Sequence, residues 1–250
     1  MAFCELHYWS PSLAIQTAAN VIIPQAENPR GPYAVFYLLH GLSDDHSIWV
    51  RRTSIERYVE GLPLIVVMPD GGRGFYTDAE AGFKYESAIV KDLIPFIDRT
   101  FQTKTDRGGR CVGGLSMGGY GAIKLALKYP ELFSSANSHS GALAWSHRPF
   151  RGNDPFNVEF RRVAGENPGG GPNDPFALAD KVERNRLPKM RIDCGTEDFL
   201  LNDNREFHAH LEKLQIPHEY EEFPGSHNWA YWDQHVQEAI KFHARNLGLK

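Results

Sequence analysis

The run "GGLSMGGYGAIKLAL", from Gly113 to Leu127, places a single serine among closely spaced glycines. Its centre, "GLSMG" at residues 114–118, fits the pattern G-x-S-x-G. The apolar run "RCVGGL" before the serine predicts a strand, and "GGYGAIKLALKYP" after it predicts a helix that closes at Pro130. A G-x-S-x-G pattern in this strand–turn–helix context predicts a nucleophile elbow.

An elbow of this kind needs glycines because the turn leaves no room for neighbouring Cβ atoms. Gly114 and Gly118 stand two residues before and two residues after Ser116, which takes the strained conformation itself. The turn exposes the Ser116 hydroxyl and points the backbone N–H of Met117 at the same space, where the helix N-terminus adds positive charge. A glycine-rich turn with a capping serine is the alternative, but the flanking pattern favours Ser116 as a nucleophile.

A serine hydroxyl needs a base to become nucleophilic, and eleven histidines compete for that role. His227 lies in "FPGSHNW" (residues 223–229), between the last predicted strand and the last predicted helix. This is the place and chain order of the histidine in Ser…Asp…His enzymes. His139 also follows a predicted strand, but it precedes any acid partner in chain order. We therefore expect His227 to be the base.

The acid should follow the strand before that one, in "RIDCGTEDFLLND" (residues 191–203). Glu197 and Asp198 come just beyond the predicted end of this strand. We expect Asp198 to fix the tautomer of His227 and to stabilise the imidazolium, with Glu197 as the alternative.

An oxyanion hole needs a second backbone donor. The loop "LLHGLSDDHSIW" (residues 38–49) follows the first long buried strand, and Gly41 lets the chain turn close to the site. We expect the N–H of Leu42 to act together with that of Met117. The neighbouring Asp44, Asp45 and His46 indicate an acidic loop, because no other cluster completes a metal site with them.

Apolar β-rich runs alternate with helix-length segments along the rest of the chain. This alternation predicts an α/β fold, with a mainly parallel sheet and helices on both faces. The carboxyl ends of the strands should share one edge, where such sheets place their sites. Two N-terminal runs, residues 4–13 and 14–24, have no helix between them and predict an antiparallel pair at the sheet edge. The predicted strands are 33–40, 62–69, 109–115, 133–140, 189–195 and 218–224, and the predicted helices are 54–60, 86–101, 117–128, 204–214 and 229–247.

The segment 141–187 breaks the alternation. It contains "NDPF" twice, at 153–156 and 173–176, and "PGGGP" at 168–172. Two four-residue matches are too short for an internal repeat, so we expect an irregular, cap-like insertion over one edge of the sheet. No linker composition suggests a second domain, and residues 1–250 are expected to form a single domain.

Composition excludes several classes of protein. The chain is 42% hydrophobic and 23% charged with a net charge of −4, and it lacks a basic stripe, which argues against a nucleic-acid partner. Its longest apolar run, residues 33–39, is far below the ~18 residues that span a membrane. Whether the chain forms a homo-oligomer stays open.

Cysteine usage indicates the compartment. Three scattered cysteines, Cys4, Cys111 and Cys194, argue against a disulfide framework and for a reducing environment. The N-terminal stretch does not have the pattern of a signal peptide. A cytoplasmic location is the expectation.

Five blocks of the sequence together resemble the tributyrin-esterase and S-formylglutathione-hydrolase group of esterases, which is related to feruloyl and acetylxylan esterases. The resemblance covers about residues 5 to 245. It implies an α/β-hydrolase fold, no cofactor, and hydrolysis of carboxylic esters or thioesters by Ser116, Asp198 and His227, with Leu42 and Met117 as oxyanion donors. The blocks are "YLLHGLSDDHSIWVRRTSIERY" (37–58), "LIVVMPDGGRGFYTD" (64–78), "GLSMGGYGAIKLAL" (114–127), "CGTEDFL" (194–200) and "SHNWAYW" (226–232).

The expected function is that of a serine carboxylesterase acting on a small-molecule ester with a short acyl chain. No long apolar insertion could form a lipase-type lid, and segment 141–187 is a poor lining for a deep alkyl tunnel. Aromatic residues near the expected site loops could form a compact pocket, with core packing as the alternative: Trp49, Phe75, Tyr76 and Trp229.

Other activities fit the same residues. An S-formylglutathione-hydrolase-type thioesterase, a feruloyl or acetylxylan esterase and an acyltransferase would all use the same triad. A non-catalytic binding module is disfavoured because all three triad positions are intact.

Overall fold

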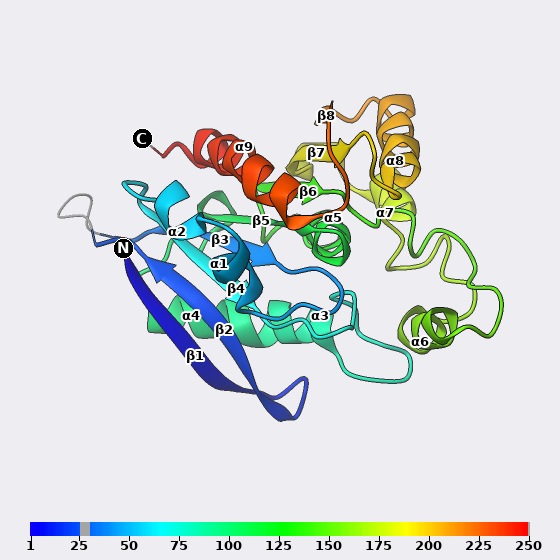
Figure 1. Cartoon of the computed structure of the whole chain (residues 1–250). Helices are drawn as coiled ribbons and strands as arrows, with labels where there is room; N and C mark the ends of the chain where they lie inside the picture. Colours follow the sequence, from blue (N-terminus) through cyan, green and yellow to red (C-terminus); the bar gives the residue numbers. More distant parts are fainter. Residues whose placement is uncertain (26–30, 250) are drawn as a thin grey trace.

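The computed structural model describes residues 1–25 and 31–249, and within these ranges eight strands form one mixed sheet (Figure 1). The strands are β1 (Ala2–Ser10), β2 (Ile15–Ile23), β3 (Ala34–Leu39), β4 (Leu64–Pro69), β5 (Arg110–Leu115), β6 (Ser135–His139), β7 (Lys189–Gly195) and β8 (Glu219–Phe223). Their order in the sheet is β1-β2-β4-β3-β5-β6-β7-β8. Strands β3 to β8 pair in parallel, whereas β2 pairs antiparallel with β1 and with β4. The predicted α/β fold with an antiparallel N-terminal edge is confirmed.

Helices fill most connections between the parallel strands. They are α1 (Ile48–Arg52), α2 (Ile55–Tyr58), α3 (Tyr85–Ser87), the π-helical turn η1 (Ala88–Leu93), α4 (Ile94–Thr100), α5 (Met117–Lys128), α6 (Pro155–Ala164), α7 (Pro175–Lys181), α8 (Leu201–Lys213) and α9 (Trp229–Leu247), with short 3₁₀ turns η2 (Arg107–Gly109) and η3 (Arg184–Arg186). Helices α1, α2 and α9 pack on one face of the sheet, and α4, α5, α7 and α8 pack on the other (Figure 1). Strands β3 and β4 are buried on both faces, which explains their uninterrupted apolar sequences.

The segment 141–187 is more regular than its composition suggests. Both copies of "NDPF" begin a helix, α6 and α7, and the expectation of irregular structure is wrong there. Asp154 accepts a hydrogen bond from the N–H of Asn157 at 3.0 Å, and Asp174 accepts one from the N–H of Phe176 at 3.0 Å. Each aspartate therefore caps its helix, and the proline that follows occupies the first turn, where its missing N–H has no consequence.

Two further features of the structure concern membrane crossing and the cysteines. No helix in residues 1–25 and 31–249 combines the length and the apolar character that crossing a bilayer requires. The three thiols are free, and Cys111 and Cys194 are buried in the core. Burial raises the pKa of both buried thiols, so neither is poised to act as a thiolate nucleophile.

Candidate active site

Ser116 occupies the turn between β5 and α5 in a strained conformation, with φ 51° and ψ −116°. The two glycines of the motif make this turn possible. A Cβ on Gly114 would lie 2.6 Å from the carbonyl oxygen of Leu39, and one on Gly118 would lie 2.6 Å from that of His40. The Ser116 N–H donates to the carbonyl of His139 at 2.9 Å, so the end of the neighbouring strand β6 holds the turn in place.

The structure brings Ser116, His227 and Asp198 into one hydrogen-bonded chain. The Nε2 atom of His227 lies 3.0 Å from the Oγ of Ser116, and its Nδ1 atom lies 2.8 Å from Oδ2 of Asp198. The three residues follow the carboxyl ends of β5, β8 and β7, three strands that run in the same direction. The Asp198 side chain is fully buried, whereas the His227 side chain keeps 17% of its surface exposed.

Hydrogen bonds keep Asp198 ionised. Burial alone would favour the neutral carboxyl, but hydrogen bonds from His227 and from the N–H of Leu200, at 2.8 Å, lower the pKa of Asp198 below its usual value. An ionised Asp198 accepts a hydrogen bond from the N–H at Nδ1 of His227. The lone pair of His227 is then on Nε2, where it is directed at the serine hydroxyl. Of the two acids considered, Asp198 contacts the histidine. The N–H of Glu197 donates to the carbonyl of Gly225 and its side chain is exposed.

The expected oxyanion donors lie beside the nucleophile. A Cβ on Gly41 would lie 3.7 Å from the Cβ of Ser116, so the loop that carries Leu42 runs against the elbow. Met117 is the first residue of α5, where backbone N–H groups have no intrahelical acceptor. Within the described ranges, the N–H groups of Leu42 and Met117 donate to no other protein group. Their role as an oxyanion hole stays a prediction.

The imidazole of His40, which the sequence interpretation left without a role, holds this loop. The N–H of Gly71 donates to Nε2 of His40 at 2.8 Å, so the ring proton sits on Nδ1 and is donated to the carbonyl of Gly41 at 2.7 Å. The hydroxyl of Tyr76 donates to the carbonyl of His40 at 3.1 Å. The conformation of the loop is therefore set by buried hydrogen bonds on both sides of residue 40.

The four aromatic pocket candidates differ in exposure. Trp49 and Tyr76 are fully buried, and the indole N–H of Trp49 donates to the carbonyl of Leu39 at 3.1 Å. Phe75 is also buried and stacks on Trp145, with 3.8 Å between ring centroids. Trp229 is half-buried and meets Trp49 edge to face. A substrate-binding role for these residues stays a prediction.

Phe199 is an aromatic neighbour of the site that the sequence interpretation did not single out. Its ring centroid lies 4.5 Å from that of His227. The available signal was a large aromatic residue placed directly after Asp198, in the loop between a predicted strand and a predicted helix.

A second histidine–aspartate pair lies deeper in the sheet. The Nδ1 atom of His139 is 2.8 Å from Asp193 Oδ2, and the hydroxyl of Tyr231 donates to Oδ1 of the same carboxylate at 3.0 Å. The side chains of His139 and Asp193 are both fully buried, so an ester cannot reach them. This pair therefore does not compete with His227 for the role of base.

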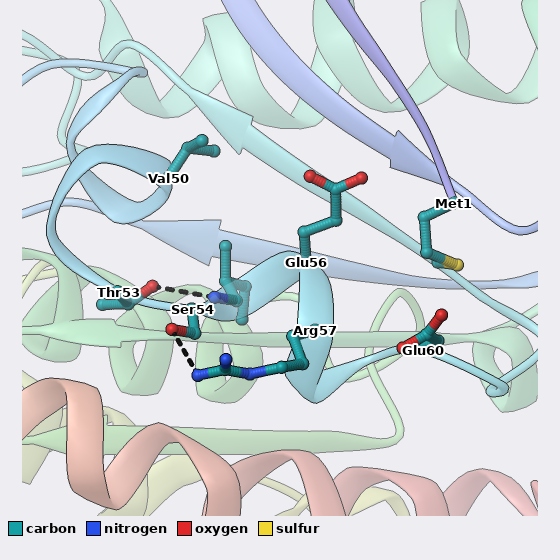
Figure 2. Close-up of a pocket in the computed structure, with 8 residues that line it drawn as sticks. Met1, Val50, Thr53, Ser54, Glu56, Arg57 and Glu60 are labelled. Atoms are coloured by element: carbon teal, nitrogen blue, oxygen red, sulfur yellow. Dashed lines mark hydrogen bonds between the residues drawn. The ribbon is translucent and has the colours of Figure 1, made fainter.

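A depression of about 440 Å³ lies elsewhere on the molecule, lined by residues of α1, α2 and the N-terminus (Figure 2). Its polar groups bind one another: Arg57 donates to Ser54 Oγ at 2.8 Å, and Thr53 Oγ1 accepts from the N–H of Ile55 at 3.1 Å. None of the three hydrogen-bonded site residues lines it, so its size does not make it the reaction site.

Comparison with known proteins agrees with this geometry. Residues 10–243 match the family model described as "Putative esterase". An acetyl esterase of Caldicellulosiruptor saccharolyticus is 29% identical over 260 residues, which cover 97% of this chain and 98% of that protein.

Two solved structures from Staphylococcus aureus are each 32% identical to this chain and cover 97% of it and 98% of their own length. One is FphF, a fluorophosphonate-binding serine hydrolase, with a TM-score of 0.88. The other is the S-formylglutathione hydrolase FrmB, with a TM-score of 0.85. The protein is thus a member of this esterase family, a serine hydrolase with the α/β-hydrolase fold.

Proposed function

We propose that the protein is a carboxylesterase that hydrolyses short-chain acyl esters through an acyl-enzyme on Ser116. The observation that carries the proposal is the unbroken hydrogen-bonded chain from Ser116 Oγ through His227 to Asp198. Such a chain gives a serine hydroxyl the base that it needs at neutral pH.

In the first half of the reaction, His227 Nε2 takes the proton of Ser116 as the hydroxyl oxygen attacks the ester carbonyl carbon. The oxyanion accepts hydrogen bonds from the N–H groups of Leu42 and Met117, two rigid donors beside the nucleophile. The tetrahedral intermediate then expels the alcohol, and His227 gives its proton to the leaving oxygen. Asp198 stays ionised throughout and stabilises the transient imidazolium.

In the second half, water takes the place of the alcohol. His227 removes a proton from the water as its oxygen attacks the acyl carbonyl, and the same two N–H groups stabilise the second oxyanion. The proton then passes from Nε2 back to the Ser116 oxygen, and the carboxylic acid leaves. Both halves need the neutral imidazole as base.

The preference for short acyl chains is supported by an aromatic cluster that segment 141–187 forms with Phe75. Phe75 and Trp145 stack at 3.8 Å, and Phe150 and Phe160 pack around Trp145 with centroids 5.4 and 5.5 Å away. Phe75 and Trp145 are 3% and 9% exposed, so these rings fill the space between the segment and the 70–77 loop. An acyl chain that extended from Ser116 into this cluster would have to displace the rings.

The test is loss of acylation in single variants. Ser116→Ala should abolish hydrolysis of p-nitrophenyl butyrate and labelling by a fluorophosphonate, since loss of the nucleophile costs on the order of 10⁶ in kcat in a protease with this triad. Asp198→Asn should cost about 10⁴, and the neighbouring Glu197→Gln variant is the matched control, with near-normal turnover.

Near-normal hydrolysis by folded Ser116→Ala protein would refute the proposal. A larger loss in Glu197→Gln than in Asp198→Asn would move the acid to Glu197. Assays with S-formylglutathione, and with added alcohol as acyl acceptor, separate an esterase from a thioesterase and from an acyltransferase.

A further inference from the structure

Phe199 is unusually exposed for an apolar residue at a catalytic site. It is 76% exposed, whereas the other exposed large apolar side chains in the described ranges lie between 41% and 56%. Isolated exposed apolar residues are common on protein surfaces and by themselves need no explanation. This one differs because its ring contacts the imidazole of His227, with a centroid distance of 4.5 Å and an interplanar angle of 50°.

The backbone on either side of Phe199 is held by hydrogen bonds. The N–H of Asp198 donates to the carbonyl of Gly195 at 3.1 Å, the N–H of Leu200 donates to Asp198 Oδ1 at 2.8 Å, and the N–H of Leu201 donates to the carbonyl of Asp198 at 3.1 Å. Helix α8 begins at Leu201. The carboxylate that orients His227 therefore also fixes the turn that presents the ring of Phe199.

The two sides of the site have different chemical roles. In the proposed mechanism, the carbonyl oxygen of the ester accepts hydrogen bonds from the N–H groups of Leu42 and Met117. His227 Nε2, which is 3.0 Å from Ser116 Oγ, must reach the leaving oxygen to protonate it. A ring in contact with His227 therefore borders the alcohol part of the substrate rather than its carbonyl oxygen.

We propose that Phe199 forms a leaving-group subsite that selects esters of apolar alcohols, aromatic ones in particular. The proposal rests on the function proposed above, because it assigns the alcohol side of that same site. The exposed surface of the ring loses contact with water when an apolar leaving group covers it, and aromatic rings gain further from edge-to-face or offset-stacked contact.

The acyl-enzyme mechanism makes this proposal separable from a general effect on His227. Acetate esters of different alcohols form the same acetyl-enzyme, so their deacylation rates are identical. A residue that touches only the alcohol acts on acylation, and its effect changes with the alcohol. A residue that merely holds His227 in place acts on both steps, and its loss lowers the rate for methyl acetate at least as much as for aromatic esters, because an alkoxide depends most on protonation by His227.

The experiment compares Phe199→Ala with the wild-type enzyme on methyl, cyclohexylmethyl, phenyl and 2-naphthyl acetates, followed by acid release. The ratio of wild-type to variant kcat/KM removes the differences in intrinsic reactivity between the esters. This ratio should be about 3 to 10 for 2-naphthyl acetate, from the strength of one aromatic contact, and within twofold of one for methyl acetate. Phe199→Trp should retain the preference, and the pH profile with methyl acetate should be unchanged.

Phe3→Ala is the matched control. Phe3 is 44% exposed on β1, and the strand register aligns it through Ile22, Val66 and Phe36 with Cys111, at the opposite end of β5 from Ser116. This variant should show a ratio near one for every ester. A Phe199→Ala ratio equal for all four acetates would overturn the subsite and leave the esterase function standing. An absence of Ser116-dependent acetate hydrolysis in the wild-type enzyme would instead refute the function.

Discussion

At the scale of single residues, the backbone of Ser116 combines reactivity with strain. Its φ of 51° and ψ of −116° fall where glycine is at ease and a residue with a Cβ is not, at a cost of about 1–3 kcal/mol. The hydrogen bond from its N–H to His139 and the bond from Ala142 N–H to its carbonyl, at 2.9 and 3.1 Å, hold it there. The strained backbone of the nucleophile therefore lowers the free energy of unfolding of the protein.

Glycine at position 116 should relieve that strain. Ser116→Gly and Ser116→Ala both lack the hydroxyl and are both inactive, so their difference reports the backbone. We expect the glycine variant to have a free energy of unfolding about 1 kcal/mol higher than that of the alanine variant in urea titrations. This net value allows for the opposing effect that glycine has more conformational freedom in the unfolded chain. Ala209→Gly, on an exposed position of α8, is the control and should lose about 0.5–1 kcal/mol. An alanine variant more stable than the glycine variant would contradict the strain.

Single residues of the site were predictable to different degrees. Ser116, Asp198 and His227 follow a known chain order at strand ends, and they do lie together, because parallel strands bring their carboxyl ends to one edge. The exposure of Phe199 and the burial of Trp49 were not predictable, because both depend on which surfaces meet in three dimensions. Nothing local distinguishes a tryptophan that packs in the core from one that lines a pocket.

At the scale of elements, the two "NDPF" sequences show what a local pattern contains and how it can be missed. Aspartate followed by proline is a helix-start signal that holds over four residues, and both copies obey it. Interpreted as too short for a repeat, they gave no prediction of α6 and α7. The longer predicted helices, such as 117–128 and 229–247, match α5 and α9 because their helix-forming sequences extend over several turns without a breaker.

A buried ion pair joins α3 to α5. The Nζ of Lys124 binds Glu86 Oε2 and the carbonyl of Tyr76, and the Lys124 side chain is fully buried. Burial favours a neutral Glu86, but Lys124, with Lys128 and Tyr129 as further partners, outweighs it and lowers the pKa of Glu86 from 4.5 to about 2. A carboxyl whose pKa is lower in the folded chain than in the unfolded chain stabilises the fold at every pH above its unfolded pKa. This stability is lost as the pH falls from about 4.5 towards 2.

Glu86→Gln should therefore destabilise the protein by about 3–5 kcal/mol at pH 7, since it leaves Lys124 buried without its counter-charge. The variant should also lose less stability than the wild type between about pH 5 and pH 3, because one titrating carboxyl is gone. Urea unfolding at several pH values measures both effects. The control is Glu206→Gln, which removes an exposed partner of Arg148 and should cost less than about 1 kcal/mol. Equal losses in the two variants would show that burial does not strengthen the pair.

At the scale of the whole molecule, the alternation of strands and helices predicted a mainly parallel sheet, but it did not predict the order of the strands. The order depends on where each connection crosses, which is decided by packing between distant segments. Strand β4, for example, lies between β2 and β3, although it follows both in the chain.

The packing of segment 141–187 against the rest of the molecule predicts the preferred length of the acyl chain. With p-nitrophenyl esters from C2 to C16, kcat/KM should increase over the first carbons, by up to about 0.8 kcal/mol of apolar contact per methylene. It should then fall once the chain meets the rings of Phe75 and Trp145. A maximum at C10 or longer, or a sharp rise at a lipid interface, would replace the short-chain esterase with a lipase.

Segment 141–187 leaves the sheet after β6 and returns to it at β7, two strands that pair directly from Ser135 with Lys189 to His139 with Asp193. Because these strands are parallel, the segment leaves the sheet at the edge where His139 pairs with Asp193 and crosses over to re-enter at the edge where Ser135 pairs with Lys189. A change in the length of such a connection alters the entropy of closing the loop only slightly, by about 0.6 kcal/mol per doubling. The N–H of Ala142 donates to the carbonyl of Ser116, so it is the part of the segment after this residue that can be exchanged while the hydrogen bonds among Ser116, His227 and Asp198 persist. Selectivity and reactivity reside in separately replaceable parts of the chain, so mutation can diversify the substrates of such an enzyme without interrupting its chemistry.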